Sequence, residues 1–571
     1  SSATDPTAGG TNAVGIGNDA VASGNNSIAL GDNATSAGVR SAAIMYSHAG
    51  GTDSFAAGIA NSSSSRGAQA GQAVAIGNNA YVQGTEAIGL GYYATIGSSG
   101  TRAVALGKSY ANGNTSLAAV IDNNTSTYGA TGANSIAMGY RAKASHSNST
   151  SIGRNSSATS GDAVALGNTA TASGASSVAI GVGAVAATSE SIALGLNATV
   201  GSSTRGTALG FSANATGSQA TAISDSVASG GNSFAAVADA TASGTDSIAL
   251  GRATTASSTY ATAIGKNSSD QGSVATSGTA AMALGGSYAS GADSLAAAIA
   301  NNTNSYGATG ANSIAMGYLS KATGVGNVNI GYQGYATGGS GSVAIGYRAR
   351  ATGTNAICLG QSGYSTASGA QSLAIGYEVT ASAEGAGAIG RGSDVAAIYG
   401  MAIGREHQIE SGANFSIASG NEAKISQYGK GAHASGKFAA VGDAQGGQFI
   451  LRCDTTDATA TVLTTNNSTA AATNQIVAAS DTCITFDGTI TAMQNGAQAY
   501  ASFRIEGLLV NDGGTTTLAN SATTVIQNLS NWGMALSADN TNNALAITFT
   551  GEAGHNIRVV ANIRTTEVTY A

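Results

Sequence analysis

The chain has 571 residues, of which 82 are Gly and one is Pro, and its formal net charge is −7. A chain of this length is too long to fold around one ordinary hydrophobic core. A hydrophobic fraction of 42% is too high for a disordered chain. Because Lys and Arg are few and scattered singly, the chain lacks the basic surface that nucleic acid binding requires, and we expect no nucleic acid partner.

The chain starts with a lead-in that we place at residues 1–10, and a short repeated motif then dominates residues 11–429. In this motif small residues alternate with aliphatic ones and a glycine follows. Clear copies are Ser27–Gly31, Ala73–Gly77, Ser177–Gly181 and Ser342–Gly346. Including degenerate copies, about 28 units stand roughly 15 residues apart, which is typical of a solenoid.

One repeat unit predicts one flattened coil made of two short strands and two tight turns. Strand geometry places Val178 and Ile180 on one face and Ala179 on the other. We expect the aliphatic side chains to point into the coil and the small ones to point out. Asn and Asp after the glycine, as at Asn18-Asp19, favour tight turns. No segment of residues 11–429 has the hydrophobic period of a helix, so this region, the shaft, is predicted to be all-β.

A longer repeat also exists, because Tyr128–Tyr140 reappears as Tyr306–Tyr318, at an offset of 178 residues. The offset indicates that a block of about a dozen coils was duplicated. Duplication of this kind lengthens a stack of coils, whereas it adds little to an enzyme site.

The repeat pattern ends near Gly429. We predict a collar at residues 430–447 and an antiparallel β-sandwich at residues 448–571. Its expected strands are Gln448–Arg452, Thr459–Thr464, Thr482–Gln494, Gln498–Val510, Asn531–Ser537, Ala544–Thr550 and Asn556–Thr569. Its expected core contains Trp532, Phe486, Phe503 and Phe549. We also expect this domain to cap the strand edges at the end of the coil stack.

Three cysteines are too few for a disulfide scaffold and have no metal-ligand spacing. Cys358 stands where the repeat has alanine, which predicts a small buried residue. Cys453 and Cys483 fall in the C-terminal domain, where they either pair or remain two separate thiols.

The remaining polar residues give no pattern for catalysis, a metal or a cofactor, so we predict that the chain is not an enzyme. None of the five histidines, His48, His146, His407, His433 and His555, has a partner at ligand spacing. His433 lies in the collar, where copies of the chain could meet at an axis. Paired carboxylates would be needed to cleave polysaccharide, and the residues to weigh by position are Glu506, Glu552 and Glu567.

Tyrosines gather near the turns of the repeat, for example at Tyr92-Tyr93, Tyr318, Tyr332 and Tyr347. Exposed tyrosines favour contact with sugars or proteins. The alternative is that they cover neighbouring coils, and the sequence favours neither.

The repeats Asn134–Gly139 and Asn312–Gly317 resemble the head repeats of trimeric autotransporter adhesins, the YadA-like head family. This resemblance implies a left-handed parallel β-roll, or β-helix solenoid, that forms a homotrimer. The outward Ala and Ser face is where we expect two identical chains to pack.

The segment from Ala432 through Gln445 into Phe449–Arg452 and the ending Asn556–Val568 resemble the C-terminal region of bacteriophage tail-fibre proteins, and we find no heptad stalk. Together the resemblances imply a virion tail fibre whose N-terminal side binds the phage tail, baseplate or an adaptor protein. The expected target is a host cell-surface glycan or outer-membrane protein. The alternatives are an adhesin on a bacterial cell surface and a polysaccharide-degrading tail spike.

Receptor contact is expected at two loops of the C-terminal domain, Asn511–Thr516 and Asp539–Asn543. The candidate contact residues are Asn511, Asp512, Thr515, Asp539, Asn540, Asn542 and Asn543. Three such sites on one trimer would gain avidity.

Overall fold

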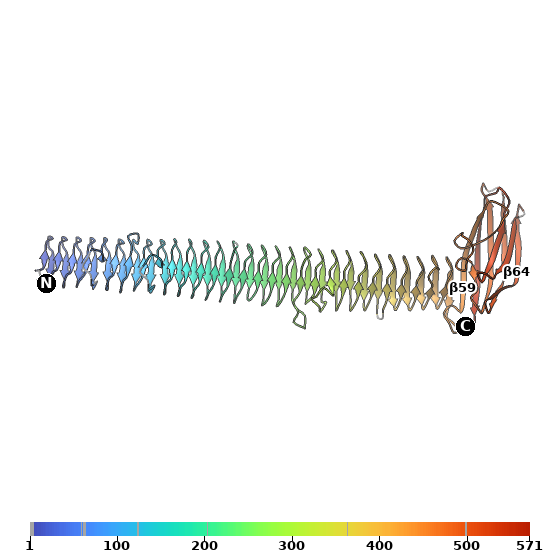
Figure 1. Cartoon of the computed structure of the whole chain (residues 1–571), viewed down its shortest axis with the longest axis horizontal. Helices are drawn as coiled ribbons and strands as arrows, with labels where there is room; N and C mark the ends of the chain where they lie inside the picture. The colour runs from blue at the N-terminus through green and yellow to red at the C-terminus, as the bar shows by residue number, and fades with distance from the viewer. Residues whose placement is uncertain are drawn as a thin grey trace. The chain divides into compact units, whose positions relative to one another are not determined.

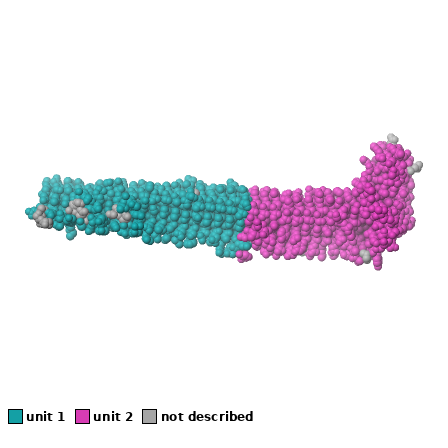
Figure 2. All heavy atoms as spheres, in the orientation of Figure 1, with its two compact units in different colours: residues 1–266, 270–280 teal, residues 267–269, 281–571 magenta. Residues whose placement is uncertain are grey.

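The computed structural model describes residues 5–58, 60, 64–122, 125–202, 204–361, 364–496, 499–530 and 532–570. Ser1–Thr4 and the expected strand starts at Gln498 and Asn531 lie outside these residues. Every regular element described is a β-strand, from β1 (Thr7–Ala8) to β67 (Ile557–Thr569). Figure 2 colours two compact units, residues 1–266 with 270–280 and residues 267–269 with 281–571.

Within each unit, short strands stack in parallel, one above another (Figure 1). Strand β10 (Val74–Ile76) pairs with β12 (Ile88–Leu90), and the two-residue strand β11 (Tyr81–Val82) pairs with β13 (Thr95–Ile96). We call the sheet that contains β10 and the other three- to five-residue strands the first sheet, and that of the two-residue strands the second sheet. The chain is thus an all-β parallel solenoid of about 30 turns, which confirms the prediction of stacked coils.

The predicted direction of the side chains was wrong. In β10, Ala75 is fully buried whereas Ile76 is 39% exposed, so the small residues point into the coil and the aliphatic ones point out. The reason is that the space between the two sheets of a coil is narrow. Where the second sheet places the larger Val82 inside, the first sheet has Gly89, and a Cβ there would lie 2.7 Å from Val82 Cγ2. A close-packed interior this narrow is filled mainly by Ala, Ser and Gly.

In most coils a glycine stands at or near the end of the strand of the first sheet, where the chain turns against the neighbouring coil. Gly376 has φ 134°, and a Cβ on it would lie 1.8 Å from the carbonyl oxygen of Gly390. Glycine adopts this backbone conformation without strain and lets the two backbones touch.

After the last parallel strand, β58 (Gly431–Ser435), the first sheet continues as a wide antiparallel sheet. Its strands follow the order β59 (Ala444–Thr455), β67, β62 (Thr482–Gln494), β63 (Tyr500–Asp512) and β64 (Thr515–Asn528). The ends of β62 agree with the prediction. Strand β64 was not predicted, because its sequence is rich in Thr, Ala and Asn and does not alternate between apolar and polar residues.

A smaller antiparallel sheet is built around β66 (Ala544–Thr550), whose ends also agree with the prediction. It pairs with β60 (Ala460–Val462), β61 (Ile476–Val477) and β65 (Gly533–Asp539). The two antiparallel sheets share one hydrophobic core that contains Phe449, Phe486, Phe503, Trp532 and Phe549. The predicted core aromatic residues are therefore confirmed.

The C-terminal domain follows directly on the last coil. Strand β59 pairs with β58 and covers the last edge of the first sheet. The second sheet ends at β57 (Lys424–Ile425), where Gln445 takes the place of a further strand. The Lys424 N–H donates to Gln445 Oε1, and Gln445 Nε2 donates to the Lys424 carbonyl, both at 2.9 Å.

Candidate functional site

In each unit the outer side of the first sheet exposes a row of apolar side chains, and we call this side the aliphatic face. In the unit of residues 1–266 with 270–280, Ile248 and Leu250 are 40% and 39% exposed. In the other unit, Ile345 pairs in register with Leu359, and they are 40% and 37% exposed. The same outward positions are apolar in coil after coil. A soluble protein rarely exposes a contiguous apolar surface of this extent unless a partner covers it.

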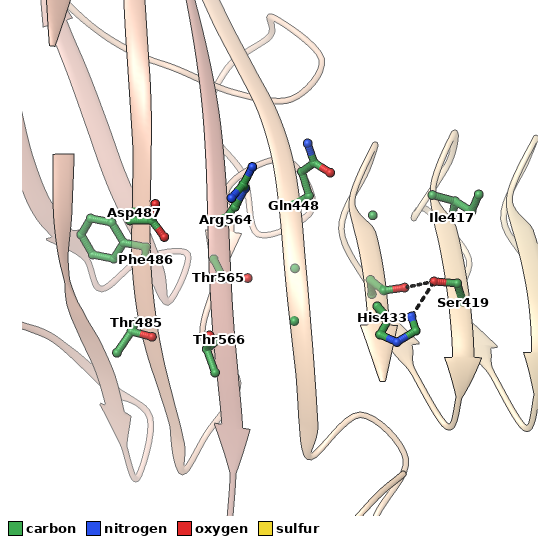
Figure 3. A pocket seen from close by; sticks show the side chains of 14 residues that line it. Ile417, Ser419, His433, Gln448, Thr485, Phe486, Asp487, Arg564, Thr565 and Thr566 are labelled. Carbon is green, nitrogen blue, oxygen red and sulfur yellow. Dashed lines mark hydrogen bonds between the residues drawn. The ribbon is translucent and has the colours of Figure 1, made fainter. Parts of the chain in front are cut away.

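The aliphatic face becomes polar in the last two coils. Ser419 and then His433 occupy the register position of Ile403, and Ser419 Oγ lies 3.0 Å from His433 Nδ1. These side chains line one side of a cavity of about 670 Å³ (Figure 3). Asp487 and Arg564, from the antiparallel sheet, line the other side.

A buried ion pair joins the last coil to the final strand. Lys430 Nζ donates to Glu567 Oε2 at 2.7 Å, and the two side chains are only 3% and 7% exposed. Gln445 Nε2 also donates to Glu567 Oε2, and the Thr565 hydroxyl donates to Oε1. Burial alone would raise the pKa of Glu567, but the charge of Lys430 and these hydrogen bonds outweigh it, so the pKa is lowered.

The three carboxylates considered for polysaccharide cleavage occupy unrelated surroundings. Glu567 is held in the buried ion pair, Glu506 is exposed on β63 beside Arg504, and Glu552 lies 3.1 Å from His555. In the part of the chain that the structure describes, no group of three or more His, Cys, Asp or Glu side chains could hold a metal ion.

The first predicted receptor loop is a tight turn between β63 and β64. Asn511 is buried, and its Nδ2 donates to the Ala478 carbonyl while its Oδ1 accepts from the Gly514 N–H. Asp512 and Thr515 are exposed. Asn511 thus shapes the turn, and its exposed neighbours are the side chains that a ligand can reach.

The second predicted loop lies against the first one. Asn540 Oδ1 accepts from the Thr516 N–H at 2.7 Å, and the Thr516 hydroxyl donates to Asn543 Oδ1 at 3.3 Å. Asp539 accepts hydrogen bonds from Asn542. Burial raises the pKa of Asp539, but these and other hydrogen bonds outweigh it and lower the pKa. The structure therefore brings the seven candidates together, and their contact with a receptor remains a prediction.

The cysteines are free thiols. Cys358 is buried in place of an alanine, as predicted, and burial raises its pKa to about 11. Cys453 pairs in register with Val559 and Cys483 with Val568, at opposite ends of β67, so a disulfide between them is not possible.

His407 is the histidine with the most constrained surroundings. Its side chain is fully buried, Nδ1 accepts from the Ala423 N–H, and Nε2 donates to the Ile403 carbonyl, both at 3.1 Å. This arrangement holds the neutral form, and desolvation lowers the pKa. Sequence reasoning gave His407 no special role, since neither hydrogen-bonding partner is recognisable from local spacing.

We expect His407 to make the fold sensitive to acid. Its stabilising effect is complete above the unfolded pKa of about 6.5 and is lost as the pH falls through the lower folded pKa. The free energy of unfolding falls by about 1.4 kcal/mol for each pKa unit by which the folded value lies below the unfolded one. Thermal unfolding followed by circular dichroism at pH 7.5 and 5.0 should show a smaller pH effect in His407→Gln. The exposed His146→Gln should behave like the original chain, and an unchanged pH effect in His407→Gln would contradict this account.

Comparison with known families identifies the repeat. The YadA head domain repeat matches residues 8–44, 68–94, 130–156, 158–184, 172–198, 202–223, 242–268, 308–326, 338–362 and 363–378. The predicted resemblance of the repeat region to YadA-like heads is thus confirmed in these segments, which occur in both units. No curated protein sequence matches the chain.

Among solved structures, the tailspike protein of Acinetobacter baumannii phage AM24 is similar at 11% identity. The match covers 69% of this chain and 78% of the tailspike, with a TM-score of 0.15. A TM-score this low supports no conclusion about fold or function. No helix of the described segments is long and apolar enough to cross a membrane.

Proposed function

We propose that the chain is a homotrimeric structural fibre that attaches a phage to its host. The observation that carries the proposal is the aliphatic face. Each coil buries little beyond Ala and Ser, while the larger Ile, Leu and Met side chains remain outside, as at Met316, Ile330 and Ile345. Packing against two identical chains buries them, and a repetitive face fits a copy with the same repeat.

The proposal assigns different roles to the parts of the chain. The YadA-like solenoid, wound left-handed as in the heads it resembles, acts as the shaft, and the C-terminal domain acts as a sandwich tip that contacts the host. The exposed parts of the paired tip loops, with Asp512, Thr515 and Asn540, are the proposed contact with a cell-surface glycan or outer-membrane protein. The N-terminal side joins the phage tail or an adaptor. The resemblance of the C-terminal segments to tail fibres favours a phage fibre over a bacterial adhesin.

An antibody raised against residues 447–571 tests this proposal. Electron microscopy of virions should show the antibody at the distal ends of tail fibres. Labelling of a bacterial surface in the absence of phage would instead support the adhesin and overturn the phage assignment.

We also propose that the fibre does not cleave polysaccharide, because Glu567 is buried in an ion pair and Glu506 and Glu552 lie apart from it on different elements. Incubation of the purified chain with host capsule should leave the length of the polysaccharide unchanged in size-exclusion chromatography. Shortened products would identify a degrading spike.

A further inference from the structure

Residues 294–377 contain no Asp or Glu, although the chain as a whole has a net charge of −7. The same stretch contains Lys321, Arg348 and Arg350. It is therefore a locally cationic part of an acidic protein, and all of it belongs to the unit of residues 281–571.

Aromatic rings stand at one turn of successive coils in this stretch. Tyr318 stacks on Tyr332 with centroids 5.0 Å apart, and Tyr332 stacks on Tyr347 at 5.1 Å with an angle of 2° between the rings. The three residues are 39–44% exposed. Because their faces cover one another, they present ring edges and hydroxyl groups, which both donate and accept hydrogen bonds.

Two arginines extend this column toward the second sheet. The Arg348 guanidinium lies over the rings of Tyr347 and Tyr364, at 5.1 and 5.4 Å. The Arg350 guanidinium lies 4.7 Å from the Tyr364 ring, and its Nε is buried without a hydrogen-bond partner in the described structure. We call Tyr318, Tyr332, Tyr347, Arg348, Arg350 and Tyr364 the tyrosine–arginine patch.

The duplicated block provides an internal comparison. At the offset of 178 residues, Arg154 takes the position of Tyr332 and Ser157 that of Tyr335. That block also contains acidic residues, among them Asp162 and Glu190. Stacking the coils therefore does not require the tyrosine column, since the same coil forms without it at β20 (Thr150–Ile152) and β21 (Ser157–Ala158).

We propose that the tyrosine–arginine patch is a lateral binding site for a linear polysaccharide that carries carboxylate groups. Guanidinium groups bind carboxylates through paired, charge-assisted hydrogen bonds, and tyrosine edges hydrogen-bond to sugar hydroxyls. A column with a regular spacing fits a ligand with a regular repeat. The patch lies on turns and the second sheet, so it does not compete with packing on the aliphatic face. The choice of a polysaccharide rests on the proposed attachment function.

Binding of the purified full chain to immobilised alginate, a linear polyuronate, tests the proposal, with neutral dextran as the reference. We expect binding to alginate alone. The double variant Arg348→Gln, Arg350→Gln should weaken it at least about tenfold, and Tyr332→Ala with Tyr347→Ala should also weaken it. The matched control is Arg141→Gln, since Arg141 likewise lies over the rings of Tyr128 and Tyr140. Unchanged thermal midpoints would show that the variants fold.

Three results would contradict the proposed site. They are no binding to alginate, an equal loss of alginate binding in Arg141→Gln, and equally tight binding to DNA. The last would show that only the attraction between opposite charges is responsible. None of them bears on the antibody labelling of virions. The attachment proposal and this site can therefore fail independently.

Discussion

Glutamate at both Ile345 and Leu359 is expected to abolish the proposed trimer. The two side chains are register neighbours on the aliphatic face. The proposed trimer would therefore bury six charges in place of aliphatic groups. Burying an unpaired charge costs several kcal/mol even after the protein relaxes, far more than one coil gains from packing. Sedimentation velocity should show the mass of one chain, or aggregates, at a concentration at which the original chain is trimeric.

The control for this experiment is Thr366→Glu with Thr380→Glu. These threonines are also register neighbours and lie in the same unit, but they belong to the second sheet. Two outward charges there should leave the mass unchanged. If Ile345→Glu with Leu359→Glu remains trimeric with the original thermal midpoint, the aliphatic face is not the interface.

The second large effect is expected from Lys430→Met, which leaves Glu567 buried without its partner. Removing one member of a buried ion pair typically costs about 3–5 kcal/mol. Trp532 lies in the core of the two antiparallel sheets, so its fluorescence reports their unfolding in urea. We expect the urea midpoint of this transition to fall markedly. Arg504→Met should have little effect, because Arg504 and Glu506 are about 60% exposed and 3.9 Å apart.

The same pair predicts a dependence on pH. Because the pKa of Glu567 is lowered in the folded chain, its contribution is complete above the unfolded value of 4.5 and is lost as the pH falls through the folded value. The double variant Lys430→Met, Glu567→Leu should regain much of the stability lost in Lys430→Met and should depend less on pH. A double variant that is no more stable than Lys430→Met would contradict this account of the pair.

The repeat made the solenoid predictable from the sequence, because a glycine followed by a tight turn in most coils leaves few other folds. The side to which the aliphatic residues point was not predictable by alternation alone. Alternation separates Val178 and Ile180 from Ala179 but does not say which face is inside. The deciding quantity is the distance between the two sheets of a coil. The contact of Val82 in one sheet with Gly89 in the other reveals this distance, and it is visible only in the three-dimensional structure.

The junction between the last coil and the C-terminal domain was the least predictable part of the structure. Lys430 and Glu567 are far apart in sequence, and neither stands in a recognisable motif. The role of Gln445 as a substitute strand depends on where β57 ends. By contrast, the strands β62 and β66 alternate clearly, and their ends were predicted. The seven candidate residues were expected to lie in two separate loops, and only the structure shows that hydrogen bonds donated by Thr516 join these loops.

The most direct test of the central claim, that the outward aliphatic side chains need two further copies of the chain, is the mass of the purified chain in solution. Light scattering after size-exclusion chromatography should give three times the mass of one chain, without a stable folded monomer on dilution. A monodisperse folded species with the mass of a single chain would contradict it.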